Sequence, residues 1–226
     1  MNKLAIIIPV FNEEKNIEKL IFDWMKEVSK FYKKNFKIII INDGSFDNTH
    51  NKIKKIKNKS ILYINQKNIG HGNTCFKGYK LAIKKKYDLI FQIDSDNQCD
   101  PKYFKHFINK IGREDAVFGN RITREDGIIR IIFSKILSVI IFLRTFVYVT
   151  DSNVPYRMIK RRILEKVIKR IPTSVVLKNV YLSYLIQKYY KIHWININFR
   201  KRLFGKTKYN FGKLAYMVIN LLFKLK

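Results

Sequence analysis

Acidic residues are scarce in this chain. Its 226 residues include 17 Asp and Glu against 46 Lys and Arg, which gives a formal net charge of +29. So large an excess of one sign predicts a polyanionic partner, such as nucleic acid, an anionic membrane or phosphorylated small molecules. Charge alone does not choose among them, and heavy use of Lys, Ile and Asn throughout the chain accounts for part of the basicity.

Cysteine and long uncharged apolar runs are also lacking. Cys75 and Cys99 stand in unlike contexts without the spacing of a metal site or a disulfide framework, so we expect a reducing compartment. No run reaches the roughly 18 to 20 uncharged apolar residues of a transmembrane helix. The apolar start is interrupted by Pro9, Glu13 and Glu14 before it is long enough for a signal peptide. We therefore expect a protein that is not integral to a membrane.

Linkers, repeats and low-complexity segments are absent as well. Hydrophobic residues make up 47% of the chain and aromatic residues 14%, which is too apolar for a disordered protein. These features predict one domain that covers residues 1–226.

The first half alternates apolar, β-branched runs with segments of helical period. The runs are 4–9, 37–41, 61–64 and 89–93. Because their residues are apolar consecutively, we expect strands covered on both faces, in an α/β fold whose sheet is mostly parallel and flanked by helices. Beyond residue 119 the pattern shows a long apolar segment, helical stretches near 160–171 and 178–190, and a final apolar run at 192–199.

Polar stretches follow each of the four runs. They read "PVFNEE", "NDGSFDNT", "NQKNIGHGN" and "DSDNQCDP". Ligands of open parallel sheets bind beyond the carboxyl ends of the strands. Four such stretches at one edge predict a binding site there.

Three carboxylates follow the fourth run within seven residues, namely Asp94, Asp96 and Asp100. Asp94 and Asp96 are one residue apart, so both side chains point to the same side. Carboxylates this close repel each other unless a cation lies near them, which predicts Mg²⁺ or Mn²⁺ bridging a nucleotide diphosphate. Gln98 could add a neutral oxygen ligand. Asp100 precedes Pro101 and suits mainly the N-cap of the next helix.

Seven stretches resemble, in order and spacing, those of family 2 glycosyltransferases, and most closely the dolichol- or polyprenyl-phosphate sugar synthases. They are "IIIPVFNEEKNI", "IINDGSFDNT", "NIGHGN", "DSDNQCDP", "GNR", "DSNVPYR" and "RLFGKTKY". The resemblance implies a GT-A, Rossmann-like fold and a metal-dependent hexosyltransferase. Such an enzyme uses a nucleotide-diphosphate sugar with Mg²⁺ or Mn²⁺ and transfers the sugar with inversion to a polyprenyl or dolichyl phosphate. Residues 1–120 would bind the nucleotide sugar, and residues 121–226 would face the acceptor and the membrane.

The resemblance also implies roles for individual residues. The donor would contact Pro9, Phe11, Glu13, Asp43, Asn68, Gly70, Asp94, Arg202, Lys206 and Thr207. The metal would be held by Asp96 and Gln98, and the reaction centre would include Asp94, Asp151 and Arg121. Because the anionic acceptor needs a cationic site, we assign its phosphate to Arg121, Arg130 and Ser134. Arg157 would be the partner of Asp151 or part of a core salt bridge.

Four positions depart from the family's pattern. Asn42 stands where a second Asp is common, Phe11 where Tyr is common, and Pro155 where Gly is usual. Cys99 replaces a His that often follows the metal-binding Gln, and it is either a poor metal neighbour or a buried filler. These departures leave the nucleobase and the sugar open, and they keep an inactive relative that only binds nucleotide sugar under consideration.

The apolar segment "IIRIIFSKILSVIIFLRT" predicts an amphipathic helix. At 100° per residue, its polar residues Arg130, Ser134, Ser138, Arg144 and Thr145 share one face, and the rest is almost wholly apolar. This pattern fits a helix in the surface of a bilayer. The alternative is a buried core helix with one solvent-exposed polar stripe. The last segment, "FGKLAYMVINLLFKLK", shows the same amphipathic pattern. We therefore expect a cytoplasmic protein, peripheral on an anionic membrane, with a membrane-anchoring partner protein left open.

Two other functions compete with this one. A glycosyltransferase of the same fold could act on a glycan or another hydroxyl acceptor, for which Asp151 would be the natural base. A nucleic-acid-binding protein would explain the charge, but acids gather where the ligand should bind and no nucleic-acid motif occurs. We therefore expect no nucleic-acid partner.

Overall fold

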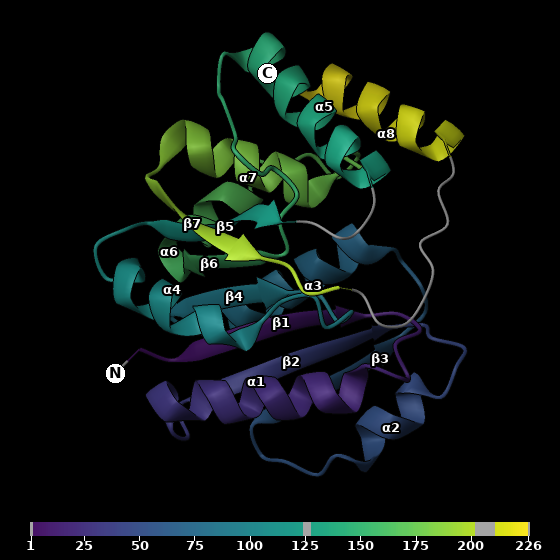
Figure 1. Ribbon diagram of the computed structural model, residues 1–226, viewed down its shortest axis with the longest axis vertical. Helices are drawn as coiled ribbons and strands as arrows, with labels where there is room; N and C mark the ends of the chain where they lie inside the picture. Colours follow the sequence, from purple (N-terminus) through teal and green to yellow (C-terminus); the bar gives the residue numbers. More distant parts are fainter. Residues whose placement is uncertain (1, 124–127, 202–210, 226) are drawn as a thin grey trace.

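The computed structural model describes residues 2–123, 128–201 and 211–225. Its strands join in one seven-stranded sheet with the order β3-β2-β1-β4-β6-β5-β7 (Figure 1). The strands are β1 (Leu4–Val10), β2 (Phe36–Asp43), β3 (Ile61–Gln66), β4 (Leu89–Ile93), β5 (Ala116–Thr123), β6 (Tyr156–Lys160) and β7 (Ile192–Asn198). The four strands expected in the first half are confirmed, and the last apolar run, for which no element type was predicted, forms β7.

The sheet is parallel except at β6. β1 pairs with β2 and β4, β2 pairs with β3, and β5 pairs with β7, all in parallel. β6 runs antiparallel to both β4 and β5. The mostly parallel α/β sheet expected from the sequence is therefore confirmed, whereas strands β5 and β6 are additions to the expected set.

Helices cover both faces of the sheet, with α1, α2 and α4 on one face and α3, α6 and α7 on the other (Figure 1). The helices are α1 (Ile17–Tyr32), α2 (Thr49–Lys55), α3 (His71–Lys84), α4 (Phe104–Ile111), α5 (Ile128–Thr145), α6 (Arg161–Ile168), α7 (Lys178–Tyr189) and α8 (Phe211–Lys224), with a 3₁₀ turn η1 (Pro101–Tyr103) before α4.

Strand β4 shows how the two faces are filled. Phe91 contacts Trp24 of α1 and Phe104 of α4, with ring centroids 5.5 Å apart in both pairs. The next residue, Gln92, lies on the other face, where the Tyr79 hydroxyl of α3 donates to its Oε1 at 3.4 Å. Because alternate side chains of a strand point to opposite faces, a strand buried on both sides must be apolar almost throughout. Polar groups are thereby concentrated at the strand ends.

Strand direction brings distant parts of the chain to one edge of the sheet. β1 to β4 are parallel, and β5 and β7 run the same way because both β4 and β5 are antiparallel to β6. Their carboxyl ends therefore share one edge with the segment that enters β6. This edge carries residues 11–16, 43–48, 66–71, 94–100, 121–123, 151–155 and 199–201.

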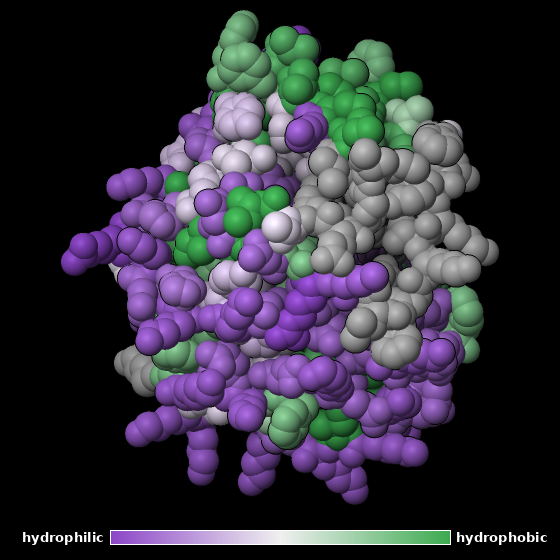
Figure 2. All heavy atoms as spheres, in the orientation of Figure 1, coloured by the Kyte–Doolittle hydropathy of each residue, from purple (hydrophilic) through white to green (hydrophobic). Residues whose placement is uncertain are grey.

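Helices α5 and α8 lie side by side at one end of the molecule (Figure 1). Ser134 and Ser138 of α5 are buried, as are Leu137 and Ile141. Most of the exposed side chains on α5 are apolar, Lys135 and Arg144 excepted, and the exposed apolar side chains of α5 and α8 gather at this end (Figure 2). We call this surface the α5–α8 apolar face, and it consists of Ile132, Ile136, Val139, Phe142, Leu143, Tyr216, Ile219, Leu222 and Phe223.

The orientation of α5 excludes one of its two expected placements, and the placement in a bilayer surface stays a prediction. A buried core helix with a solvent-exposed polar stripe is wrong, because Ser134 and Ser138 face the protein while five large apolar side chains are exposed, namely Ile132, Ile136, Val139, Phe142 and Leu143. Ser138 donates to the carbonyl of Ser134, and the hydroxyl of Thr145 donates to the carbonyl of Ile141, so these hydroxyls are satisfied within the helix. In the part of the chain that the structure describes, no helix is long and apolar enough to cross a membrane.

Candidate active site

The turn after β3 is held by Asp43, which ends β2. The Asp43 carboxylate is buried and accepts the backbone N–H groups of Ile69 at 2.9 Å and Gly70 at 3.0 Å, and the side chain of Gln66 at 2.9 Å. The Asn68 side chain donates to the Asp43 carbonyl at 2.8 Å. Asp43, Asn68 and Gly70 are thus brought together as expected, but the described contacts of Asp43 organise the turn. Its contact with a base or ribose stays a prediction.

Gly44 allows this turn to come close. Its φ is +74°, and a Cβ at this position would lie 2.7 Å from the backbone nitrogen of Asn68. Neither the backbone conformation nor the space admits another residue without strain. The link between the ends of β2 and β3 therefore depends on a glycine.

The loops after β1 and β2 are joined by hydrogen bonds. Asn12 donates its N–H to the Ser45 hydroxyl at 2.9 Å and accepts the N–H of Phe46 at 3.0 Å. Phe11, expected to line the nucleotide pocket, is 44% exposed and meets the Phe46 ring edge-on, with centroids 5.8 Å apart. Pro9 is buried in β1. These loops present an aromatic edge beside the carboxyl ends of the strands.

Glu13 is buried behind this loop. Its carboxylate accepts the Asn16 side chain at 2.6 Å, and its N–H donates to Thr49 at 2.9 Å. These contacts connect the loop after β1 to the starts of α1 and α2. A role for Glu13 in donor binding stays a prediction.

Asp94, the first carboxylate after β4, forms a pair with His71. The imidazole Nε2 lies 2.9 Å from Asp94 Oδ1, and Gln92 Nε2 donates to the same oxygen at 3.0 Å. Burial acts to raise the pKa of Asp94, but the cations of His71, Arg157 and Arg121 outweigh it, and the pKa is lowered. Desolvation acts to lower the pKa of His71, but the charges of Cys75 and Asp94 outweigh it and hold this pKa well above its usual value. Both shifts favour the charged forms, so the pair is favoured as an ion pair.

Asp96 and Gln98 have the donor atoms of a metal site completed by a ligand. Asp96 is partly exposed and its Oδ1 accepts the N–H of Gln98 at 3.2 Å. The Gln98 amide nitrogen donates to the carbonyl of Arg200 at 3.1 Å, which leaves Oε1 as the end of the amide that suits a cation. Among the described residues no group of three His, Cys, Asp or Glu could hold a metal ion by itself. One or two carboxylates suffice for Mg²⁺ when substrate phosphates complete the shell, so these residues fit the expected ion.

Arg121, Asp151 and Ser134 meet at the ends of β5, the entry to β6 and α5. The Arg121 guanidinium donates Nε to Asp151 Oδ2 at 2.6 Å and Nη2 to Oδ1 at 2.7 Å, and both side chains are 6% exposed. The Ser134 hydroxyl lies 3.5 Å from Asp151 Oδ1. The sequence prediction grouped these residues correctly in space. Their catalytic and acceptor roles stay predictions.

Of the two roles expected for Arg157, pairing with Asp151 is wrong, because Asp151 pairs with Arg121 instead, and the described contacts of Arg157 are to carbonyls rather than a core salt bridge. Arg157 is buried, and its guanidinium donates to the carbonyls of Val154 and Asn179, the latter at 3.0 Å. Arg157 lies opposite Gln92 in the sheet. Backbone carbonyls therefore hold its guanidinium in the core, close to Asp94.

Two further expectations concern the turn that follows Gln98. Asp100 accepts the N–H of Lys102 at 3.0 Å, which confirms its role as an N-cap. The Cys99 thiol is buried and donates to the carbonyl of Pro155 at 3.1 Å, as a buried filler would. Burial, followed by the charges of Asp94 and Asp96, raises its pKa well above the usual value, so Cys99 stays a thiol.

Four predicted residues lie outside what the structure describes. Arg202, Lys206 and Thr207 fall in residues 202–210, and the side chain of Arg130 is likewise not described. Conversely, sequence reasoning missed His71 and Arg200. His71 was visible only as a member of "NIGHGN", and its bond to Asp94 spans 23 residues. Arg200 stood in a basic run with no signal to separate it from its neighbours.

The His71–Asp94 pair predicts a pH dependence of stability. A raised His pKa stabilises the fold below its unfolded value, usually 6.5, and this contribution is lost as pH rises through the folded pKa. A lowered Asp pKa stabilises the fold above its unfolded value, usually 3.8, and this is lost as pH falls through the folded pKa. Replacing His71 by Gln should therefore lower the free energy of unfolding most between pH 3.8 and 6.5 and least in alkaline solution. Urea unfolding at pH 5 and pH 9 measures this; equal losses at both would contradict the pair.

Comparisons with known proteins agree with this fold. Residues 5–185 match the family described as Glycosyl transferase family 2. An uncharacterized Methanocaldococcus jannaschii protein is 34% identical over 175 residues, which cover 72% of this chain and 73% of that protein. The undecaprenyl-phosphate 4-deoxy-4-formamido-L-arabinose transferase of Proteus mirabilis is 25% identical over 98% of this chain and 67% of its own length.

Solved structures show the same architecture. The glucosyl-3-phosphoglycerate synthase of Mycobacterium tuberculosis, crystallised with phosphoglyceric acid, superposes with a TM-score of 0.72 at 14% identity, over 99% of this chain and 80% of that one. The same enzyme with Mn²⁺, UDP and glucosyl-3-phosphoglycerate gives a TM-score of 0.68 at 14% identity, with the same coverage. At this identity the likeness shows the GT-A fold alone. The family match, by contrast, rests on sequence along most of the chain, and this protein belongs to glycosyl transferase family 2.

Proposed function

We propose that this glycosyltransferase moves a sugar, with inversion, from a nucleotide-diphosphate sugar to a polyprenyl or dolichyl phosphate at the cytoplasmic surface of a membrane. Two findings support the proposal. The relatives that align with almost the whole chain are named as undecaprenyl-phosphate sugar transferases. A solved enzyme of the same fold contains Mn²⁺ and UDP.

The donor would lie over the carboxyl ends of β1 and β4. The sheet order changes direction there, because the chain builds outward from β1 to β2 and β3 and then returns to place β4 on the other side of β1. Ligands of α/β sheets bind at such a switch point. Asp94 would contact the sugar or ribose, and Asp96 with Gln98 would hold Mg²⁺ or Mn²⁺. When bound, that ion would offset the negative charge on the departing diphosphate.

The observation that carries the acceptor assignment is the buried pair of Arg121 and Asp151. Both Asp151 oxygens accept from the Arg121 guanidinium, so this carboxylate is poorly placed to take a proton from a hydroxyl acceptor. A phosphate oxygen is already anionic at neutral pH and needs no base. The pair therefore favours a lipid phosphate over the alternative of a glycan or other hydroxyl acceptor.

The chemistry that follows is a single displacement. A phosphate oxygen of the acceptor attacks the anomeric carbon from the face opposite the diphosphate, a new carbon–oxygen bond forms, and the bond to the diphosphate breaks. Attack from the opposite face inverts the configuration. The chain's own residues would position the two anions and offset their repulsion, with Arg121 and Ser134 beside the acceptor phosphate.

The α5–α8 apolar face would rest on the membrane. A monomer rarely exposes so many apolar side chains in one place without a partner. Lys135 and Arg144 are exposed on α5 itself, and each cation near an anionic bilayer surface adds about 1 kcal/mol to binding. Ser134 faces inward from the same helix and reaches Asp151, so the proposed membrane face adjoins the proposed acceptor site. An integral-membrane partner that anchors the enzyme stays a prediction.

Asp96→Asn tests the metal assignment. In this variant the nucleotide affinity measured with Mn²⁺ should fall by at least about 100-fold, because a divalent cation supplies several kcal/mol of charge stabilisation. Calorimetric titration of UDP and GDP, with and without Mn²⁺, measures this gain. Asp115→Asn is the matched control, since Asp115 precedes β5 at the opposite edge of the sheet. Wild-type-like affinity with Mn²⁺ in Asp96→Asn would remove the assignment.

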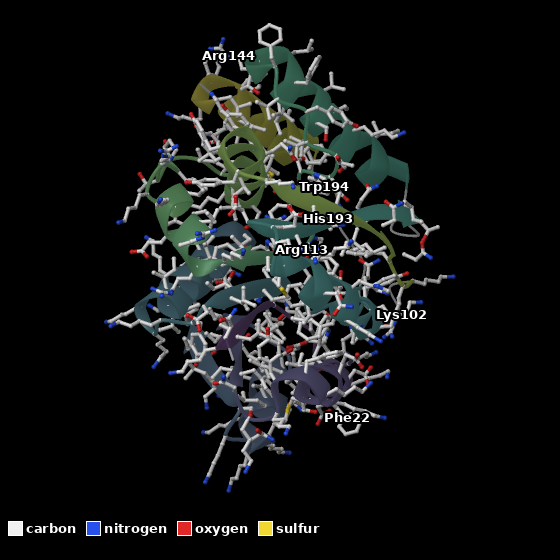
Figure 3. The ribbon with its side chains drawn as sticks, turned by 90° about the vertical axis from the view of Figure 1, so that its left-hand side faces the viewer. Phe22, Lys102, Arg113, Arg144, His193 and Trp194 are labelled. Carbon is white, nitrogen blue, oxygen red and sulfur yellow. The ribbon has the colours of Figure 1, made fainter. Side chains whose placement is uncertain are left out.

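Sedimentation with liposomes tests the membrane face. Wild-type protein should sediment with anionic vesicles, and less so as salt rises. Leu143→Glu and Phe223→Glu, at side chains 70% and 81% exposed, should each weaken sedimentation several-fold, because a charge is placed in the apolar face. Phe22→Glu is the control, because Phe22 is 66% exposed on α1 and lies at the end of the molecule away from Arg144 of α5 (Figure 3). Equal weakening by all three substitutions, or no sedimentation of the wild type at low salt, would reject this surface as the membrane face.

A further inference from the structure

The turn that carries Gln98 is joined to the segment that follows β7. The N–H of Arg200 donates to the carbonyl of Gln98 at 3.0 Å, and the Gln98 side-chain amide donates to the carbonyl of Arg200 at 3.1 Å. The backbone N–H and the backbone carbonyl of Arg200 thus both form hydrogen bonds with Gln98. The contact spans 102 positions in the sequence, and Gln98 is 1% exposed.

The side chain of Arg200 fastens the same turn at a second point. Its Nη2 lies 2.7 Å from Asp100 Oδ1, and its Nη1 lies 4.0 Å from Asp23 of α1. Asp100 is also the N-cap of η1, so it fixes the start of the helix that follows the turn. The side chain of Asp100 is only 11% exposed, which reduces the screening of its charge pair with Arg200.

We propose that Arg200 is a positioning residue for the cation held by Asp96 and Gln98, an inference that rests on the proposed function. Arg200 would not contact the ion itself. It would act through Gln98, because the hydrogen bond to the Arg200 carbonyl occupies the amide nitrogen and leaves Oε1 to face a bound cation. Partners of this kind orient metal ligands and typically contribute 10- to 100-fold to metal affinity.

The guanidinium makes this orientation depend on the Arg200 side chain. The backbone carbonyl of Arg200 is correctly placed only while the segment after β7 stays against the turn. Asp100 and Asp23 hold that segment through the guanidinium. Removing the side chain should loosen the segment and let the Gln98 amide rotate, while the turn after β3 and the aromatic edge of Phe11 and Phe46 are untouched. Nucleotide binding without metal is therefore expected to survive.

The test measures the gain in nucleotide affinity that Mn²⁺ provides. Calorimetric titrations with UDP and GDP, each in Mn²⁺ and in EDTA, are made on wild type, Arg200→Ala and Arg200→Lys. In Arg200→Ala the Mn²⁺-dependent gain should fall about 10-fold or more, with affinity in EDTA unchanged. Arg200→Lys keeps the charge near Asp100 and should recover part of the gain. Lys201→Ala, at the exposed neighbouring residue, should behave as wild type.

The possible results separate this inference from the proposed function. If wild type shows no gain from Mn²⁺ with either nucleotide, the proposed metal site fails and the inference fails with it. If wild type shows the gain and Arg200→Ala retains it fully, only the inference is overturned. Equal losses in Mn²⁺ and EDTA would indicate general damage and would also overturn it. Should Arg200→Ala fail to fold, Asp100→Asn removes the same ion pair while keeping a capping oxygen, and it must show the same selective loss.

Discussion

Burial of β1, β2 and β4 on both faces is the constraint on which the rest of this structure depends. Strands covered on both sides have almost no room for polar side chains, so the chemistry collects where the strands end. Because β6 alone is reversed, the carboxyl ends of the other strands share one edge with the segment that enters β6. Residues from nearly the whole length of the chain thereby reach one place, including Asp43, Asp94, Arg121 and Asp151.

The electrostatics of this edge differ from those of the molecule as a whole. A chain with a net charge of +29 gathers carboxylates here and provides each of three with a close partner. Asp94 is paired with His71, Asp100 with Arg200, and Asp151 with Arg121. Such pairs fix the direction of these three carboxylates, and the partly exposed Asp96 lies beside them. Fixed charges of both signs at one edge would suit the anionic donor, anionic acceptor and divalent cation of the proposed function.

Much of the fold could be predicted because its signals are local. Consecutive apolar residues located β1, β2, β3 and β4, and motif order located Asp94, Asp96 and Arg121 at one edge. Strands β5 and β6 carried weaker signals, since Gly119 and the buried Arg157 interrupt their apolar pattern. The polar residues of α5 were identified, but periodicity does not say which face meets the protein, and Ser134 and Ser138 turned inward. Contacts such as His71 with Asp94 and Arg200 with Gln98 depend on the meeting of distant segments, which no local pattern encodes.

Nucleotide release in the presence of vesicles is the measurement that tests whether the sugar is transferred to a lipid phosphate. GDP-mannose, UDP-glucose and UDP-N-acetylglucosamine would each be offered with Mn²⁺, to liposomes with and without polyprenyl phosphate. We expect that one nucleotide is released only when the lipid phosphate is present, with the sugar recovered on the lipid. Release that is independent of the lipid, or sugar transferred to an added glycan instead, would contradict it.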